Sequence, residues 1–133
     1  MNQTTIIYIF GNSLLSDDSL PLQLLPDLQK SFPNIIFVHQ DPNEDFPPPT
    51  ERNPHIIDTV AGISKPLLLD LSDLKLIEQT PVSPHDYDLL FHLLLLKKLK
   101  KIDGAKIFGI PQSFSMRNKD QIIVWFRGRI TST

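Results

Sequence analysis

The sequence predicts an α/β fold: a three-layer α/β/α sandwich around a mostly parallel five-stranded sheet. Short runs of β-branched and aromatic residues recur along the chain, and each run is followed by a turn signal. Segments with apolar residues at helical spacing alternate with these runs. Because the runs are apolar at consecutive positions, they are typical of strands that are covered on both faces. The chain has 133 residues, and we expect residues 1–133 to form a single domain.

The first part of the chain predicts a strand, a helix and a second strand. Residues 5–10 form the first apolar run, and a helix is expected from about residue 18 to residue 32. Pro26 should kink or interrupt this helix. Residues 35–38 form the second strand. Residues 41–54 are polar and rich in proline, so they predict a surface loop.

The remaining part predicts three more strands and two more helices. Strands are expected at residues 55–60, 66–70 and 105–110. A long apolar helix should run from His85 to about residue 100, with a proline in its first turn. Residues 118–130 carry apolar side chains at helical spacing, although their β-branched and aromatic content leaves a strand as an alternative.

Composition excludes several classes of protein. There is no cysteine, which excludes a disulfide scaffold, a thiol nucleophile and a cysteine-built metal site. The net charge of −2 does not suggest a protein that binds nucleic acid mainly through phosphate contacts. No stretch is apolar for the roughly 18 to 20 residues that a membrane span needs. The first residues do not resemble a signal peptide, so we expect a cytoplasmic protein.

Candidate functional residues lie where the predicted strands end and the predicted helices begin. The sequence has no glycine-rich phosphate-binding motif, zinc-protease motif or nucleophile elbow. In an open α/β sheet, sites gather beyond the carboxyl ends of the strands. Three such places carry polar groups: Asn12 with Asp17 and Asp18, then Asp58, then His85 with Asp86 and Asp88. Two carboxylates with an imidazole would suit a divalent metal ion. Alternatively, Asp17 and Asp18 are capping acids, Asp58 is a turn acid and His85 is a first-turn histidine.

Four segments share their order and spacing with motifs of one protein family. Residues 11–18 read GNSLLSDD, residues 56–62 read IIDTVAG, residues 83–86 read SPHD and residues 107–111 read IFGIP. Together they resemble the nickel–iron hydrogenase maturation proteases. In that family a G-N-x-L-x-x-D-[DE] motif is followed by a strand that ends in aspartate, an S-x-H motif before a long apolar helix, and a closing strand with a proline turn.

The resemblance implies an endopeptidase that recognises nickel in the precursor of a hydrogenase large subunit and then removes its C-terminal extension. The positions that match the family's nickel ligands are Asp18, Asp58 and His85, and the resemblance implies that these residues are also the catalytic ones. The nickel would be carried by the substrate, so the free enzyme could be without metal. The hydrogenase precursor is the expected partner, with no nucleic acid and no membrane span.

Two alternatives remain at this point. The family commonly has an Asp-Gly-Gly-Thr-like turn after its second strand, whereas this chain has HQDPNED at residues 39–45. This departure favours a non-catalytic nickel-checkpoint or binding module of the same fold. The other alternative is an unrelated flavodoxin-like domain that binds a ligand. We interpret His92 as a core or surface histidine. Asp88 is either a solvated helix acid or a carboxylate that orients His85 from one turn away.

Overall fold

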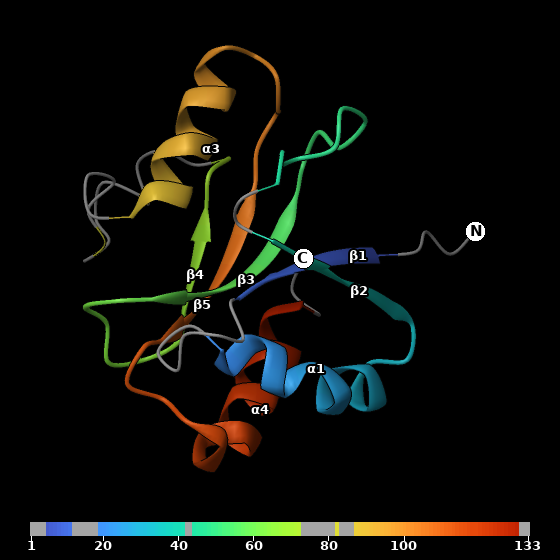
Figure 1. The fold of residues 1–133 in the computed structure, drawn as a ribbon, viewed down its shortest axis with the longest axis vertical. Helices are drawn as coiled ribbons and strands as arrows, with labels where there is room; N and C mark the ends of the chain where they lie inside the picture. Colours follow the sequence, from blue (N-terminus) through green and yellow to red (C-terminus); the bar gives the residue numbers. More distant parts are fainter. Residues whose placement is uncertain (1–4, 12–18, 42–43, 73–81, 83–86, 131–133) are drawn as a thin grey trace.

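The computed structural model describes residues 5–11, 19–41, 44–72, 82 and 87–130, and it has the predicted α/β architecture. A five-stranded sheet runs through the centre, with helices on both faces (Figure 1). The elements are β1 (Thr5–Phe10), α1 (Leu20–Ser31), β2 (Ile35–Gln40), β3 (His55–Val60), β4 (Leu67–Asp70), α3 (Asp88–Lys98), β5 (Lys106–Pro111), the 3-10 turn η2 (Met116–Asn118) and α4 (Lys119–Ile130).

The strand order is β2-β1-β3-β5-β4, in which only the edge strand β4 is antiparallel to its neighbour. The carboxyl ends of β1, β3 and β5 therefore lie on the same side of the sheet, where these parallel strands end. In the register of β3 with β5, Asp58 is opposite Gly109. A Cβ atom at Gly109 would lie 2.9 Å from Val60 Cγ2 and 3.2 Å from the Leu67 carbonyl oxygen. The neighbouring strands pack so closely there that β5 needs a residue without a side chain.

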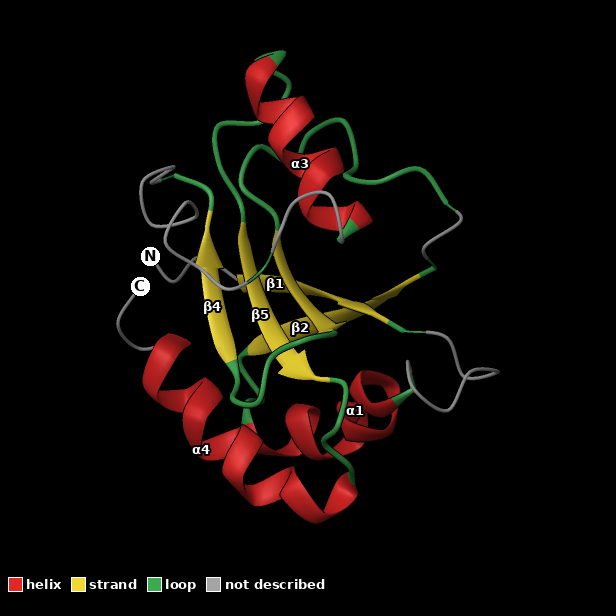
Figure 2. Cartoon of the chain, turned by 90° about the vertical axis from the view of Figure 1, so that its left-hand side faces the viewer, coloured by secondary structure: helices red, strands yellow, loops and turns green. Residues whose placement is uncertain are grey.

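Helices lie against both faces of the sheet (Figure 2), and each face has its own apolar core. Successive side chains of a strand point to opposite faces, so consecutive apolar residues serve both layers. Helices α1 and α4 pack on one face, over the fully buried Ile7, Ile9 and Phe108. Helix α3 packs on the other face, where its buried Leu90 and Leu93 belong to the same cluster as side chains of β1, β3 and β5. The consecutive apolar runs of the sequence correspond to strands covered on both faces.

The last element is a helix rather than a strand, and Pro26 does not interrupt the first helix. The last element is helix α4: Ile122 and Phe126, one turn apart, are buried, while Val124 between them is 67% exposed. A strand would have placed all three on one face. In α1 the helix continues through Pro26, whose side chain is on the exposed side.

Helix α3 begins later than predicted. Its first residue is Asp88, and Tyr87 before it has an extended backbone with φ −136° and ψ 98°. The prediction that the helix starts at His85 is therefore wrong, because an extended residue at position 87 cannot be part of an α-helical turn. Residues 83–86 themselves lie outside the part of the chain that the structure describes.

Candidate functional site

The centre of the candidate site is Asp58, near the carboxyl end of β3. Its side chain lies on the α3 face of the sheet, in line with the buried Ile56 and Val60, and it is only 8% exposed. One carboxylate oxygen accepts the Thr59 backbone N–H at 2.8 Å, and the other accepts the Tyr87 hydroxyl at 2.6 Å. Buried charges are costly unless hydrogen bonds compensate them. These two bonds offset part of that cost and fix the direction of the carboxylate.

Tyr87 is a site residue that the sequence analysis did not identify. It is the N-cap residue of α3, and its ring packs against the core beneath that helix. The contact joins residues that are 29 positions apart in the chain, so no local pattern reveals it. The only hint in the sequence is that Tyr87 follows His85 by two positions.

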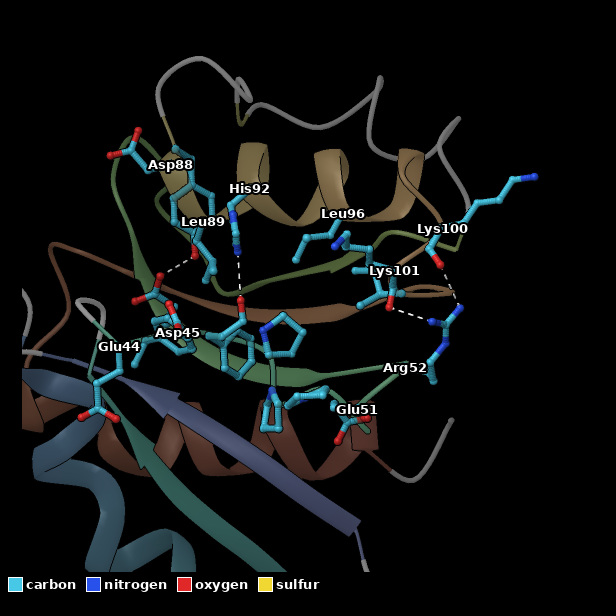
Figure 3. Close-up of a pocket in the computed structure, with 18 of the residues that line it drawn as sticks. Glu44, Asp45, Glu51, Arg52, Asp88, Leu89, His92, Leu96, Lys100 and Lys101 are labelled. Atoms are coloured by element: carbon cyan, nitrogen blue, oxygen red, sulfur yellow. Dashed lines mark hydrogen bonds between the residues drawn. The ribbon is translucent and has the colours of Figure 1, made fainter.

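A cleft of about 1300 Å³ opens beside Asp58 (Figure 3). One wall is the side of α3 that carries Asp88, Leu89, His92 and Leu96, and the opposite wall is the loop of residues 44–52. The cleft therefore lies between α3 and the proline-rich loop. Its volume exceeds the range of about 300 to 1,000 Å³ that is usual for small-molecule pockets, so a segment of polypeptide can fit.

The loop that forms the second wall is anchored to the sheet. Phe46 is buried and makes edge-to-face contacts with Tyr8 and Phe10, with ring centroids 5.0 and 4.9 Å apart. His92 of α3 lies with Nε2 2.9 Å from the Phe46 carbonyl oxygen. Because a carbonyl oxygen can only accept, the ring nitrogen donates this bond. His92 thus ties the loop to α3, which agrees with its interpretation as a structural histidine.

The far end of the cleft is basic. Arg52 donates to the Asp103 carboxylate, at 2.9 Å from Oδ1, and to the carbonyl oxygens of Lys101 and Lys100 at 2.8 and 3.2 Å. The hydrogen bond from Arg52 lowers the pKa of Asp103, and the same bond raises the pKa of Arg52. The guanidinium therefore holds in place the backbone that carries Lys100 and Lys101.

We expect Tyr87→Phe to lower the free energy of unfolding by about 1.5 kcal/mol, because a hydrogen bond to a charged group contributes about 1.5 to 3 kcal/mol. Urea denaturation followed by circular dichroism measures the change. Tyr8→Phe is the matched control, since its hydroxyl makes a longer bond of 3.2 Å to Glu51. If Tyr87→Phe is as stable as the unmodified protein, the contact with Asp58 is not a stabilising one.

His55, which opens the strand that carries Asp58, makes stability depend on pH. Burial lowers the pKa of His55 below 6.5, and Lys106 lowers it further, while Glu51 and Asp70 oppose the shift. The unfolded chain therefore binds a proton at His55 before the folded chain does. Stability from this group is present above about pH 6.5 and is lost as the pH falls through the lowered folded pKa.

We therefore expect the free energy of unfolding to fall between pH 7.5 and pH 5.5, and to fall less in His55→Gln. Urea midpoints at the two pH values measure this difference. His39→Gln, at an exposed histidine on β2, is the control. If the pH dependence is the same in His55→Gln and in the unmodified protein, His55 is not the group that causes it.

Of the residues that the sequence singled out, the structure describes Asp58 and places it in the cleft. Asp18 and His85 lie outside the described residues. Within the described part of the chain, there is no group of three or more histidine and acidic side chains that could hold a metal ion. Asp88 is exposed on the cleft wall, as expected of a solvated helix acid.

Comparison with known proteins gives one structural similarity. No family profile and no curated protein sequence matches the chain. The fold resembles the crystal structure of an uncharacterized protein from Wolinella succinogenes, with a TM-score of 0.59 and 14% sequence identity over 98% of this chain and 96% of that one. This similarity supports the fold. Among the described residues, no helix has both the length and the apolar character needed to cross a bilayer.

Proposed function

We propose that this protein is a cytoplasmic endopeptidase that removes the C-terminal extension of a nickel–iron hydrogenase large-subunit precursor after nickel insertion. The observation that carries the proposal is Asp58: a buried carboxylate, held by two hydrogen bonds, beside a cleft large enough for a peptide. A processing enzyme needs both a fixed polar group and room for a protein tail.

The positions of the family-like segments within the fold support this proposal. The segment that begins at Gly11 follows β1, the segment with Asp58 is β3, and the segment that ends at Pro111 is β5. Ligand sites of open α/β sheets lie at the carboxyl ends of such parallel strands. The segment with His85 precedes Tyr87, whose hydroxyl contacts Asp58. The parallel strands β1, β3 and β5 thus end on the same side of the sheet.

In the proposed reaction, Asp18, Asp58 and His85 bind nickel that the substrate carries. Nickel accepts carboxylate and imidazole ligands, and a metal ion in such a site can polarise a peptide carbonyl. Asp58 accepts hydrogen bonds from the Thr59 backbone N–H and the Tyr87 hydroxyl. The bonds from Thr59 and Tyr87 orient it as outer-shell partners orient metal ligands elsewhere.

A second candidate function is a nickel-checkpoint module that binds the precursor without cutting it. The observation that favours it is that residues 39–45 lack the family's glycine-containing turn. The loop of residues 44–52 is instead tied to the sheet by Phe46 and to α3 by His92. The two functions differ in one outcome: only the peptidase shortens the precursor.

Nickel binding should depend on pH, because the metal needs a neutral imidazole and ionised carboxylates. A histidine with an ordinary pKa near 6.5 is mostly protonated at pH 5, so we expect binding to be about 30-fold weaker at pH 5 than at pH 8. Calorimetric titration of the protein with nickel or cadmium at both pH values measures this. His92→Gln should keep the difference and His85→Gln should remove it; equal affinities at both pH values would exclude His85 as a ligand.

A further inference from the structure

The cleft has opposite charges at its two ends, and this pattern describes the peptide that fits it. We infer that the cleft takes an extended segment of polypeptide with an apolar middle and a negatively charged group at the end bound by Lys100 and Lys101. The inference rests on the proposed function and adds the chemical class of the substrate tail. It is drawn from the described cleft residues alone.

The end of the cleft near the start of α3 is acidic. Asp58 lies there, and the cleft is also lined by Asp88 and by Glu44 and Asp45 of the facing loop (Figure 3). Acidic side chains repel a carboxylate and attract a cation. This end therefore suits the part of the substrate that carries the metal ion, and disfavours its acidic end.

The opposite end of the cleft is lined by Arg52, Lys100 and Lys101, and one acidic residue, Glu51, lies beside Arg52 (Figure 3). The Arg52 guanidinium is already engaged by the Asp103 carboxylate and by two backbone carbonyls. Lys100 and Lys101 are therefore the cationic residues of the described lining that remain to attract an acidic ligand, although the Lys100 side chain extends away from the cleft and has to turn toward a bound peptide. Because Arg52 holds the carbonyls of both lysines, the backbone beneath these ammonium groups is fixed.

The distance between the two ends sets the length of the segment. Helix α3 has 11 residues, which corresponds to about 16 Å at about 1.5 Å per residue. An extended peptide rises about 3.3 Å per residue, so about five residues cover this length. Apolar residues also line the cleft: the half-buried Leu89 and Leu96 of α3, with the more deeply buried Phe10, Phe46 and Ile102. These contacts favour apolar residues in the middle of the segment.

Peptide binding to the intact protein tests the inference without nickel and without cleavage. Two fluorescein-labelled peptides share four alanine and leucine residues and end in either two glutamates or two lysines. By fluorescence anisotropy at low salt, we expect the glutamate peptide to bind about fivefold more tightly, since each exposed charge pair contributes up to about 1 kcal/mol. In the double variant Lys100→Glu/Lys101→Glu the preference should reverse, and Lys101→Glu alone should weaken it.

Lys98→Glu is the control, because Lys98 is on the same end of α3 but does not line the cleft. It should keep the preference for the glutamate peptide.

Three outcomes would overturn the inference: equal affinities for both peptides, no binding of either peptide, or an unchanged preference in the double variant. The lysines would then only offset the negative end of the helix dipole. If the protein discriminates between the two peptides but does not shorten a nickel-loaded precursor, the proposed function is wrong and this inference still holds.

Discussion

Asp58→Asn should reduce processing of a nickel-loaded hydrogenase precursor by more than about 100-fold, the upper end of what loss of an outer-shell partner costs a metal site. The substitution removes the negative charge that is proposed to bind nickel. It preserves the shape of the side chain: the amide oxygen can still accept from Thr59, and the amide nitrogen can donate to the Tyr87 oxygen. The fold should therefore remain while the activity is lost.

Asp70→Asn is the matched control, because Asp70 ends the edge strand β4 and does not line the cleft. It should process the precursor at the normal rate. Asp18→Ala and His85→Ala are expected to lose processing as Asp58→Asn does, with unchanged circular dichroism spectra. If folded Asp58→Asn processes the precursor at the normal rate, the Asp58 carboxylate does not act in the proposed mechanism.

Phe108→Ala should lower the free energy of unfolding by about 3 to 5 kcal/mol, the usual cost of truncating a buried phenylalanine. Phe108 of β5 is fully buried in the core between the sheet and helices α1 and α4. Its ring makes edge-to-face contacts with Phe126 and Trp125 of α4, at centroid distances of 4.8 and 6.0 Å. Truncation leaves a cavity between sheet and helix that the surrounding layers cannot close without moving apart. The urea midpoint measures the loss.

Phe91→Ala provides the comparison for the same chemical change. Phe91 is on α3 and is 53% exposed, so its truncation should change the free energy of unfolding by no more than about 0.5 kcal/mol, as for most surface substitutions. If the two variants lose similar stability, the core on the α1 and α4 face is not packed as described here.

The fold could be predicted because each strand of this sheet carries its own signal. The run at residues 55–60 has buried apolar residues on both faces, Ile56 and Val60 on one and Ile57 on the other, and a parallel strand covered on both faces has this pattern. The start of α3 could not be predicted in the same way. Ser83 and Pro84 form a typical helix-start sequence, but Tyr87 has an extended backbone and its hydroxyl contacts Asp58. This tertiary contact outweighs the local preference.

The candidate site could be predicted only in part, for a similar reason. Asp58 was identifiable because a polar residue stands at the end of an apolar strand, where α/β proteins place their sites. The hydrogen bonds from Tyr87 to Asp58 and from His92 to Phe46 join residues 29 and 46 positions apart. Their partners are set by the packing of α3 on the sheet, which no local pattern encodes. The charge separation along the cleft also depends on that packing.

The most direct test of the proposed peptidase is the mass of the hydrogenase precursor after incubation with this protein. The large-subunit precursor, with its C-terminal extension, is prepared with and without nickel and is then analysed by intact-mass spectrometry. We expect the nickel-loaded precursor to lose its C-terminal extension, while the nickel-free precursor keeps its full mass. A nickel-loaded precursor that binds this protein and keeps its full mass would contradict the peptidase and assign the protein to the checkpoint role.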